Sequence, residues 1–175
     1  MGKIILFMKI LSIDPGFERV GIAIIEKTFL QKDILLYSAC FKTSAKIPFP
    51  ERLRNIGNEV EKIIKKYKPE VLAIEKLYFT TNQKTAMGVS EARGTIVYVA
   101  SKNGLSVYEY TPPQIKVAVT GYGKAGKEML MSMVPKLIDI KKGINSDDEL
   151  DAIAIGLTCL ACEKLSTALK VLQRK

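Results

Sequence analysis

The chain has 175 residues, of which 47% are hydrophobic and 26% charged, a balance typical of a soluble globular protein with a single domain over residues 1–175. This composition excludes a disordered chain, a collagen-like fibre and a disulfide scaffold, and no apolar run reaches the roughly 20 residues that cross a bilayer. The excess of 27 Lys and Arg over 18 Asp and Glu gives a net charge of +9, which indicates a polyanionic partner such as nucleic acid.

The N-terminal segment has no small-residue cleavage site of the kind that ends a secretory leader. Met8 is a second possible start, which would make residues 1–7 an upstream extension. Three cysteines without a leader predict a reducing, cytoplasmic compartment. Cys159 and Cys162 lie in an apolar helical run, and we expect both to be core thiols, because the chain has no histidine and no second cysteine pair to complete a zinc site.

Short apolar runs that end in turn residues predict three antiparallel strands at the start of the chain, and strands and helices follow. The expected elements are strands 9–14, 20–26 and 34–41, a helix that follows Pro50 and ends at Tyr67, strand 71–75, helix 85–102, strand 105–110, and helices 112–120, about 127–138 and about 147–169. This order predicts an α/β fold with a mixed five-stranded sheet flanked by helices.

Four acidic residues stand where a carboxylate is costly. Asp14 and Glu75 end two predicted strands, and Asp148 and Asp151 are three residues apart on one face of an otherwise apolar helix. Carboxylates that converge repel one another unless a cation lies between them, and hard Mg²⁺ prefers oxygen ligands. Four carboxylates could hold two ions about 3.5–4 Å apart, the arrangement used for phosphodiester hydrolysis.

Each of these residues also has an ordinary structural interpretation. Asp14 in Asp-Pro-Gly could be a turn former, and Glu75 could be a solvated charge at a strand end. Asp147 and Asp148 could be favoured by the dipole at a helix N-terminus. The four positions taken together favour the metal site. Without histidine, acid–base and metal chemistry in this chain has to use carboxylates, lysines or tyrosines.

Four stretches of the chain resemble the RuvC family of Holliday-junction endonucleases, which have a ribonuclease-H-like fold. They are LSIDPGFERVGIAII at 11–25, VLAIEKLYFTTNQKTAMGVSEARG at 71–94, VYEYTPPQIKVAVTGYGKAGK at 107–127 and DDELDAIAIGLTC at 147–159. The Ala-Arg-Gly, Tyr-x-Pro-x-x-x-Lys and Asp-x-x-Asp-Ala motifs make the resemblance specific, whereas the Asp-Pro-Gly strand is shared with actin-like kinases.

The resemblance implies four acidic ligands at Asp14, Glu75, Asp148 and Asp151. Asp147 is a competing choice, because it also shares a helical face with Asp151, although the Ala-Ile-Ala-Ile that follows favours Asp148. Some relatives carry histidine at that position, so this site would be all oxygen. The implied cofactor is Mg²⁺, two ions per subunit, with Mn²⁺ as a possible substitute.

Basic and aromatic residues between the acidic stretches suit a DNA partner. Lys116, Lys124 and Lys127 cluster near the glycine-rich turns at 121–126, where phosphate contacts would be salt-sensitive. The resemblance implies that Lys116 and Lys127 bind DNA and support catalysis near the scissile phosphate. Tyr78 and Phe79 follow Glu75 and could stack on unpaired bases. The family usually has phenylalanine at position 78, where it wedges into the junction.

The segment 121–127 also fits the G-x-x-x-x-G-K pattern of a phosphate-binding loop. Such a loop needs Ser or Thr next and a strand before it, whereas Glu128 follows and the preceding residues predict a helix. We therefore interpret these residues as part of the DNA-binding surface.

The predicted activity is resolution of four-way DNA junctions in recombination and repair by symmetric Mg²⁺-dependent nicking, with 5′-phosphate and 3′-hydroxyl products. One ion would activate water and the other would stabilise the leaving 3′ oxygen. Paired cuts require a homodimer. The resemblance implies that the helix at 85–102 lies in the dimer interface, and that a junction-binding protein and a branch-migration ATPase are partners. The alternatives are a ribonuclease-H-like nuclease acting on RNA or hybrids, and a non-catalytic actin-like nucleotide-binding protein.

Overall fold

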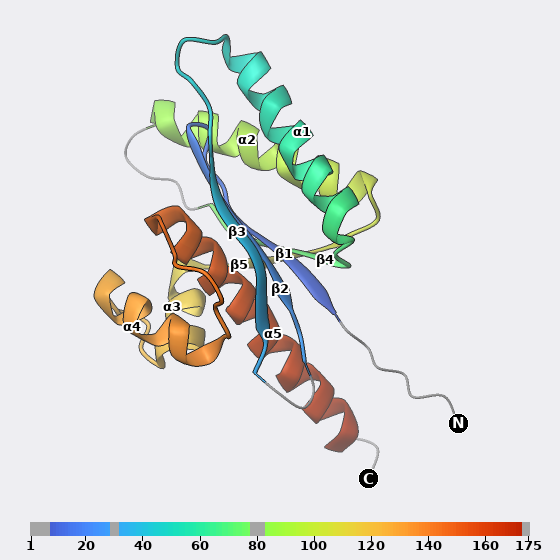
Figure 1. The fold of residues 1–175 in the computed structure, drawn as a ribbon, viewed down its shortest axis with the longest axis vertical. Coiled ribbons are helices and arrows are strands. Elements are labelled where there is room, and N and C mark those ends of the chain that lie inside the picture. Colours follow the sequence, from blue (N-terminus) through green and yellow to red (C-terminus); the bar gives the residue numbers. More distant parts are fainter. Residues whose placement is uncertain (1–7, 29–31, 78–82, 173–175) are drawn as a thin grey trace.

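The computed structural model describes residues 8–28, 32–77 and 83–172, arranged around a five-stranded sheet (Figure 1). In chain order the elements are β1 Lys9–Asp14, β2 Arg19–Glu26, β3 Ile34–Lys42, α1 Phe49–Tyr67, β4 Val71–Glu75, α2 Gln83–Lys102, β5 Ser106–Tyr110, α3 Pro112–Thr120, α4 Lys127–Leu137 and α5 Asp147–Leu172. The structure confirms the predicted mixed sheet flanked by helices, with element ends shifted by a few residues.

The strand order is β3-β2-β1-β4-β5. β1, β2 and β3 form an antiparallel meander, whereas β4 pairs with β1 and β5 pairs with β4 in parallel. Parallel neighbours need crossover connections, and α1 and α2 provide them. Because β1 and β4 run in the same direction, their carboxyl ends, which carry Asp14 and Glu75, meet at one edge of the sheet.

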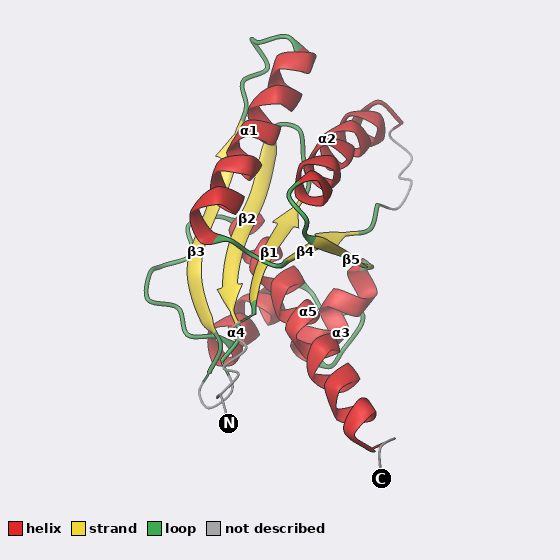
Figure 2. Ribbon diagram, turned by 90° about the vertical axis from the view of Figure 1, so that its right-hand side faces the viewer, coloured by secondary structure: helices red, strands yellow, loops and turns green. Residues whose placement is uncertain are grey.

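Helices cover both faces of the sheet, which explains why the middle residues of its central strands are buried and mostly apolar (Figure 2). On one face α1 and α2 enclose a core that includes Ile13, Ile56 and Ile96, all fully buried. On the other face α3, α4 and α5 pack around Ile153 and Val134. Among the described residues, no helix has the length and apolar character needed to span a membrane.

The depth at which α5 lies on the sheet is set by Gly156. A β-carbon there would lie 2.6 Å from Ile25 Cδ1 and 2.7 Å from Ser12 Oγ, so the helix backbone rests directly on β1 and β2. This close packing buries Cys159 as expected. The expectation of a second core thiol was wrong: Cys162 is exposed, because the C-terminal part of α5 extends away from the sheet (Figure 2).

Candidate active site

Three separate stretches of chain bring acidic side chains to the carboxyl edge of β1 and β4. Asp14 and Glu75 end these neighbouring strands, and α5 begins beside them with Asp148 and Asp151 in its first turns. The N-terminus of α5 comes close to β2 because residue 21 is glycine. A β-carbon on Gly21 would lie 2.0 Å from the Asp148 carbonyl oxygen and 3.2 Å from Asp14 Cβ.

The predicted carboxylates lie close enough for their negative charges to raise one another's pKa values. Burial, followed by the negative charges of Glu75, Asp151 and Asp148, raises the pKa of Asp14 from 3.8 to about 7. Burial and the charge of Asp151 also raise the pKa of Glu75. The pKa of Asp151 is raised too, mainly by burial. A nearby cation would stabilise the charged form of a buried carboxyl group whose pKa is raised in this way, as it is for Asp14.

Two basic side chains already neutralise the carboxylates of α5. Arg19 donates from Nε at 2.9 Å and from Nη2 at 2.5 Å to Asp148 Oδ2, and the Cys40 thiol donates to the same oxygen at 3.4 Å. Burial acts to raise the pKa of Asp148, but these hydrogen bonds outweigh it and lower that pKa. Lys127 Nζ lies 2.9 Å from Asp147 and 3.7 Å from Asp151, and the hydrogen bond to Asp147 raises the pKa of the amine.

Asp147 and Asp148 differ in orientation. The Asp147 side chain is 66% exposed and forms an ion pair with Lys127. The Asp148 side chain is 20% exposed, and its negative charge raises the pKa of Asp14. The arrangement therefore favours Asp148 as the partner of the strand carboxylates.

The donor set suits a hard divalent cation. All four side chains offer oxygen, and three negative charges act on Asp14 while only Lys127 opposes them. In the described part of the chain, no three acidic or cysteine side chains already form a closed ligand cluster. Arg19 and Lys127 instead form ion pairs with two carboxylates of α5. An arriving ion would exchange with these contacts.

The predicted DNA-binding lysines border the same edge. Lys116 lines a small cavity of about 140 Å³ together with Glu75 and Asp151, and its charge lowers the pKa of Glu75. Lys124 is exposed in the turn between α3 and α4, and Lys127 opens α4. Since α3 precedes this turn, residues 121–127 lack the strand that a nucleotide-binding loop needs. Tyr78 and Phe79 lie outside the described residues.

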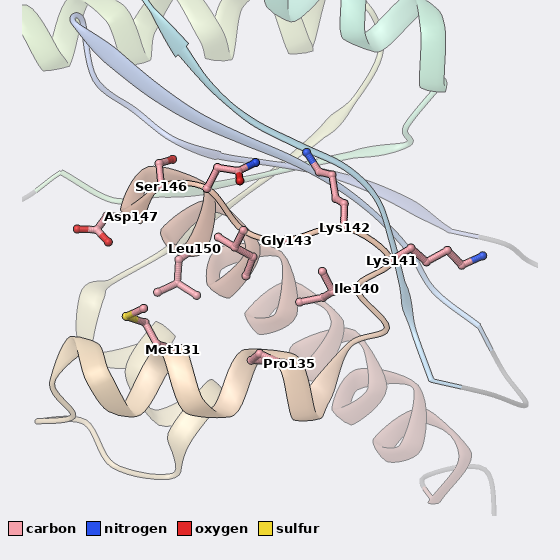
Figure 3. Close-up of a pocket in the computed structure, with 11 residues that line it drawn as sticks. Met131, Pro135, Ile140, Lys141, Lys142, Gly143, Ser146, Asp147 and Leu150 are labelled. Carbon is pink, nitrogen blue, oxygen red and sulfur yellow. The ribbon is translucent and has the colours of Figure 1, made fainter.

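Two larger cavities flank the carboxylates. One of about 560 Å³ lies between α2 and the ends of β4 and β5, and Glu75 forms part of its wall. The other, of about 630 Å³, lies between α4 and the segment before α5 (Figure 3). Asp147 is at its rim, Met131 and Leu150 line its apolar side, and Lys141 points away from it. Of these two larger cavities, the first adjoins a predicted ligand, Glu75, and the second does not.

Several residues of the site were not predicted from the sequence. Arg19 and Cys40 meet Asp148 from β2 and β3, and Glu149, only 4% exposed, accepts a hydrogen bond from Ser38 Oγ at 2.7 Å. Arg93 donates to the Glu75 carbonyl oxygen at 3.2 Å. The position of Arg93 in the Ala-Arg-Gly motif was the only signal in the sequence that pointed to any of them.

Comparisons with known proteins agree with this arrangement. The family model described as crossover junction endodeoxyribonuclease RuvC matches residues 10–159. The chain is 43% identical over 150 residues to the RuvC protein of Desulfitobacterium hafniense, covering 86% of this chain and 90% of that protein. It is 42% identical over 147 residues to that of Petrotoga mobilis, covering 84% and 90%.

Solved structures give the same result. The structure of Thermus thermophilus RuvC in complex with Holliday junction substrate matches with a TM-score of 0.85 and 31% identity, covering 91% of this chain and 97% of that one. The yeast mitochondrial Holliday junction resolvase Ydc2 has a TM-score of 0.65 at 12% identity, covering 89% of this chain and 80% of that one, which shows a shared fold. The carboxylate-lined edge thus occurs in a chain that belongs to the RuvC family of crossover junction endodeoxyribonucleases.

Proposed function

We propose that this chain resolves four-way DNA junctions as a homodimer, with Mg²⁺ held by Asp14, Glu75, Asp148 and Asp151. The observation that carries the proposal is the convergence of strand-end and α5 carboxylates at one edge of the sheet, where burial and three neighbouring negative charges raise the pKa of Asp14. The T. thermophilus relative in complex with a Holliday junction supports the choice of substrate. The absence of histidine leaves an all-oxygen donor set, which favours Mg²⁺, with Mn²⁺ as a substitute.

The chain's own residues divide the work of phosphodiester hydrolysis. Asp14 and Glu75 present oxygens from rigid strand ends, and Asp148 and Asp151 present theirs from α5. Bound divalent ions, two per subunit, would supply Lewis acidity at the phosphate and a more acidic water. Lys116 and Lys127 lie where they can offset charge on the phosphate as it develops, and Lys124 can contact the flanking backbone.

Dimer formation is supported by exposed apolar side chains on α2. Met87 and Tyr98 are 66% and 65% exposed, and Tyr98 also lines a shallow groove between α1 and α2. Solvent exposure of large apolar groups on one helix is a feature of association surfaces. A second copy related by two-fold symmetry would provide the second active site for the paired cut. A junction-binding protein and a branch-migration ATPase remain the expected partners, and the cytoplasm the expected compartment.

The experiment that tests the function is cleavage of a panel of labelled substrates. A synthetic four-way junction should be nicked symmetrically in strands of like polarity when Mg²⁺ is present, and should stay intact with EDTA. Plain duplex of the same sequence should be cut slowly or not at all. Preferred cutting of an RNA–DNA hybrid would instead identify the ribonuclease-H-like alternative, and ATP binding without nicking the actin-like one.

Asp148 and Asp147 can be separated by matched substitutions. We expect Asp148→Asn to lower the cleavage rate by about a hundredfold or more, because a group facing the strand carboxylates is lost. Asp147→Asn should change the rate only by about a fewfold, because its side chain is exposed and Lys127 still has Asp151. Single-turnover cleavage of the junction measures both. The reverse ranking would assign the ligand to Asp147.

A further inference from the structure

The C-terminal end of β4 pairs one residue further with β5 than with β1. On the β5 side, Glu75 is in register with Tyr110, and the Lys76 N–H donates to the Tyr110 carbonyl oxygen at 2.8 Å. On the β1 side, the register stops one residue earlier, at Ile13 and Ile74. Glu75 is therefore the residue at which the strand begins to leave the sheet, although its carboxylate belongs to the proposed metal site.

A side chain from α2 reaches this strand end. Arg93 Nε donates to the Glu75 carbonyl oxygen at 3.2 Å, and its Nη2 forms an ion pair with Glu109 on β5. Glu109 is in register with Ile74, so the guanidinium spans the last residues of β4 and its neighbouring strand. The Arg93 side chain is 19% exposed, and with Glu109 it lines the cavity that Glu75 also borders.

We propose that Arg93, oriented by Glu109, is a positioning residue that fixes the backbone of Glu75 and so aims its carboxylate at the metal site. The inference rests on the proposed function, since it takes Glu75 to be a metal ligand. Arg93 acts on the carbonyl oxygen of Glu75 and leaves the carboxylate to the ion. Removing a residue that orients a metal ligand without touching the metal typically lowers metal affinity or activity by about 10- to 100-fold.

Arginine suits this role better than lysine does. Its planar guanidinium has several N–H donors at fixed angles, so one donor can contact a carbonyl while another pairs with a carboxylate. A lysine ammonium could neutralise Glu109, but it lacks the fixed geometry that ties the two strands together. The contact also connects α2, the helix proposed for the dimer interface, to the proposed ligand on β4.

The test measures Mn²⁺ binding to the full-length protein by titration calorimetry in the absence of DNA, together with single-turnover junction cleavage. Arg93→Gln is expected to weaken Mn²⁺ binding and slow cleavage by about 10- to 100-fold each. Glu109→Gln should cause a smaller loss in both measurements, and the double variant should be no worse than Arg93→Gln, because the two residues act as one unit. Compared with Arg93→Gln, Arg93→Lys should recover more of the wild-type thermal midpoint than of the wild-type Mn²⁺ affinity.

Two reference variants make the outcome unambiguous. Arg54→Gln removes an exposed ion pair with Glu51 on α1, at 3.8 Å, and should change neither measurement. Glu75→Gln reports whether Glu75 binds the ion at all: if it leaves Mn²⁺ affinity unchanged, the proposed role of Glu75 fails and the positioning role with it. If Glu75→Gln weakens binding and Arg93→Gln stays within about twofold of wild type, only the positioning role is wrong.

A purely structural role for the ion pair would give a different result. The variants would then unfold at lower temperature but bind Mn²⁺ normally when folded, and that result would also overturn the inference. Should Arg93→Gln fail to fold, Glu109→Gln decides the matter, because its side chain is 43% exposed and its loss leaves no buried charge at position 109. Unchanged Mn²⁺ affinity in a folded Glu109→Gln protein would contradict the proposal.

Discussion

Replacing Asp14 with asparagine is expected to abolish junction cleavage and, at the same time, to stabilise the metal-free protein. Loss of a carboxylate that holds metal, the role proposed for Asp14, would remove several kcal/mol of transition-state stabilisation, or about a thousandfold in rate. The same change removes a buried negative charge that Glu75, Asp151 and Asp148 repel. Single-turnover cleavage and thermal unfolding in EDTA measure the two effects on one variant.

The size of the stability gain should depend on pH. The pKa of Asp14 is about 7 in the folded protein and near 3.8 in the unfolded chain, so the folded state binds this proton more tightly. Below about pH 4 the Asp14 carboxyl is protonated in both states and does not destabilise the folded protein. As the pH rises towards 7 and above, the charged carboxylate lowers the free energy of unfolding by at most about 4 kcal/mol. The advantage of Asp14→Asn should thus be absent near pH 4 and grow to on the order of 10 °C in thermal midpoint above pH 7.

Asp139→Asn is a suitable control, because Asp139 is exposed and lies outside the acidic edge. We expect it to change neither the cleavage rate nor the difference in thermal midpoint between low and high pH. An Asp14→Asn protein less stable than wild type at pH 8 without metal would contradict the electrostatic account of the site. Rapid cleavage by that variant would remove Asp14 from the metal-holding set.

The second large effect is expected from Gly21→Ala, although residue 21 has no chemical role. Its new methyl group would lie 2.0 Å from the Asp148 carbonyl oxygen and 2.7 Å from the carbonyl carbon, both main-chain atoms that cannot rotate away. Either α5 or β2 has to move, which should cost roughly 2–4 kcal/mol of stability. A shift of about 1 Å between the carboxylates should also slow cleavage by about a hundredfold.

Denaturant unfolding and single-turnover cleavage check this expectation. Gly143→Ala provides the comparison, because a β-carbon there would meet no atom within 4 Å, and its stability should stay within about 0.5 kcal/mol of wild type. Wild-type cleavage by Gly21→Ala would show that the approach of α5 to β2 tolerates displacement.

The strand half of the site could be predicted from the sequence because it depends on local patterns. Apolar runs that end in Asp14 and Glu75 place both carboxyl groups at strand ends, and parallel pairing then brings the two ends together. The spacing of Asp148 and Asp151 needed only helical geometry. The resemblance to a known family supplied the substrate, the ligand set and the roles of the lysines, which residue spacing alone does not provide.

The cationic partners could not be predicted, because they depend on how distant elements pack. Arg19 and Asp148 are 129 residues apart in sequence, and only the position of α5 against β2 joins them. Glu149 was missed for a different reason. A charged residue in the first turn of a helix is ordinarily solvated, whereas this one is buried against Ser38 with Lys142 nearby, at 3.8 Å.

The division of charge between the strand carboxylates and those of α5 has a consequence for the form of the protein without the proposed ions. Arg19 and Lys127 accompany the carboxylates of α5, and the strand carboxylates are anchored by a sheet that stays paired. The repulsion that remains falls on Asp14, where a pKa of about 7 allows it to be relieved by protonation near neutral pH. If the chain binds ions as proposed, their departure would be compensated by uptake of a proton from solvent, and the backbone arrangement of the site would be preserved.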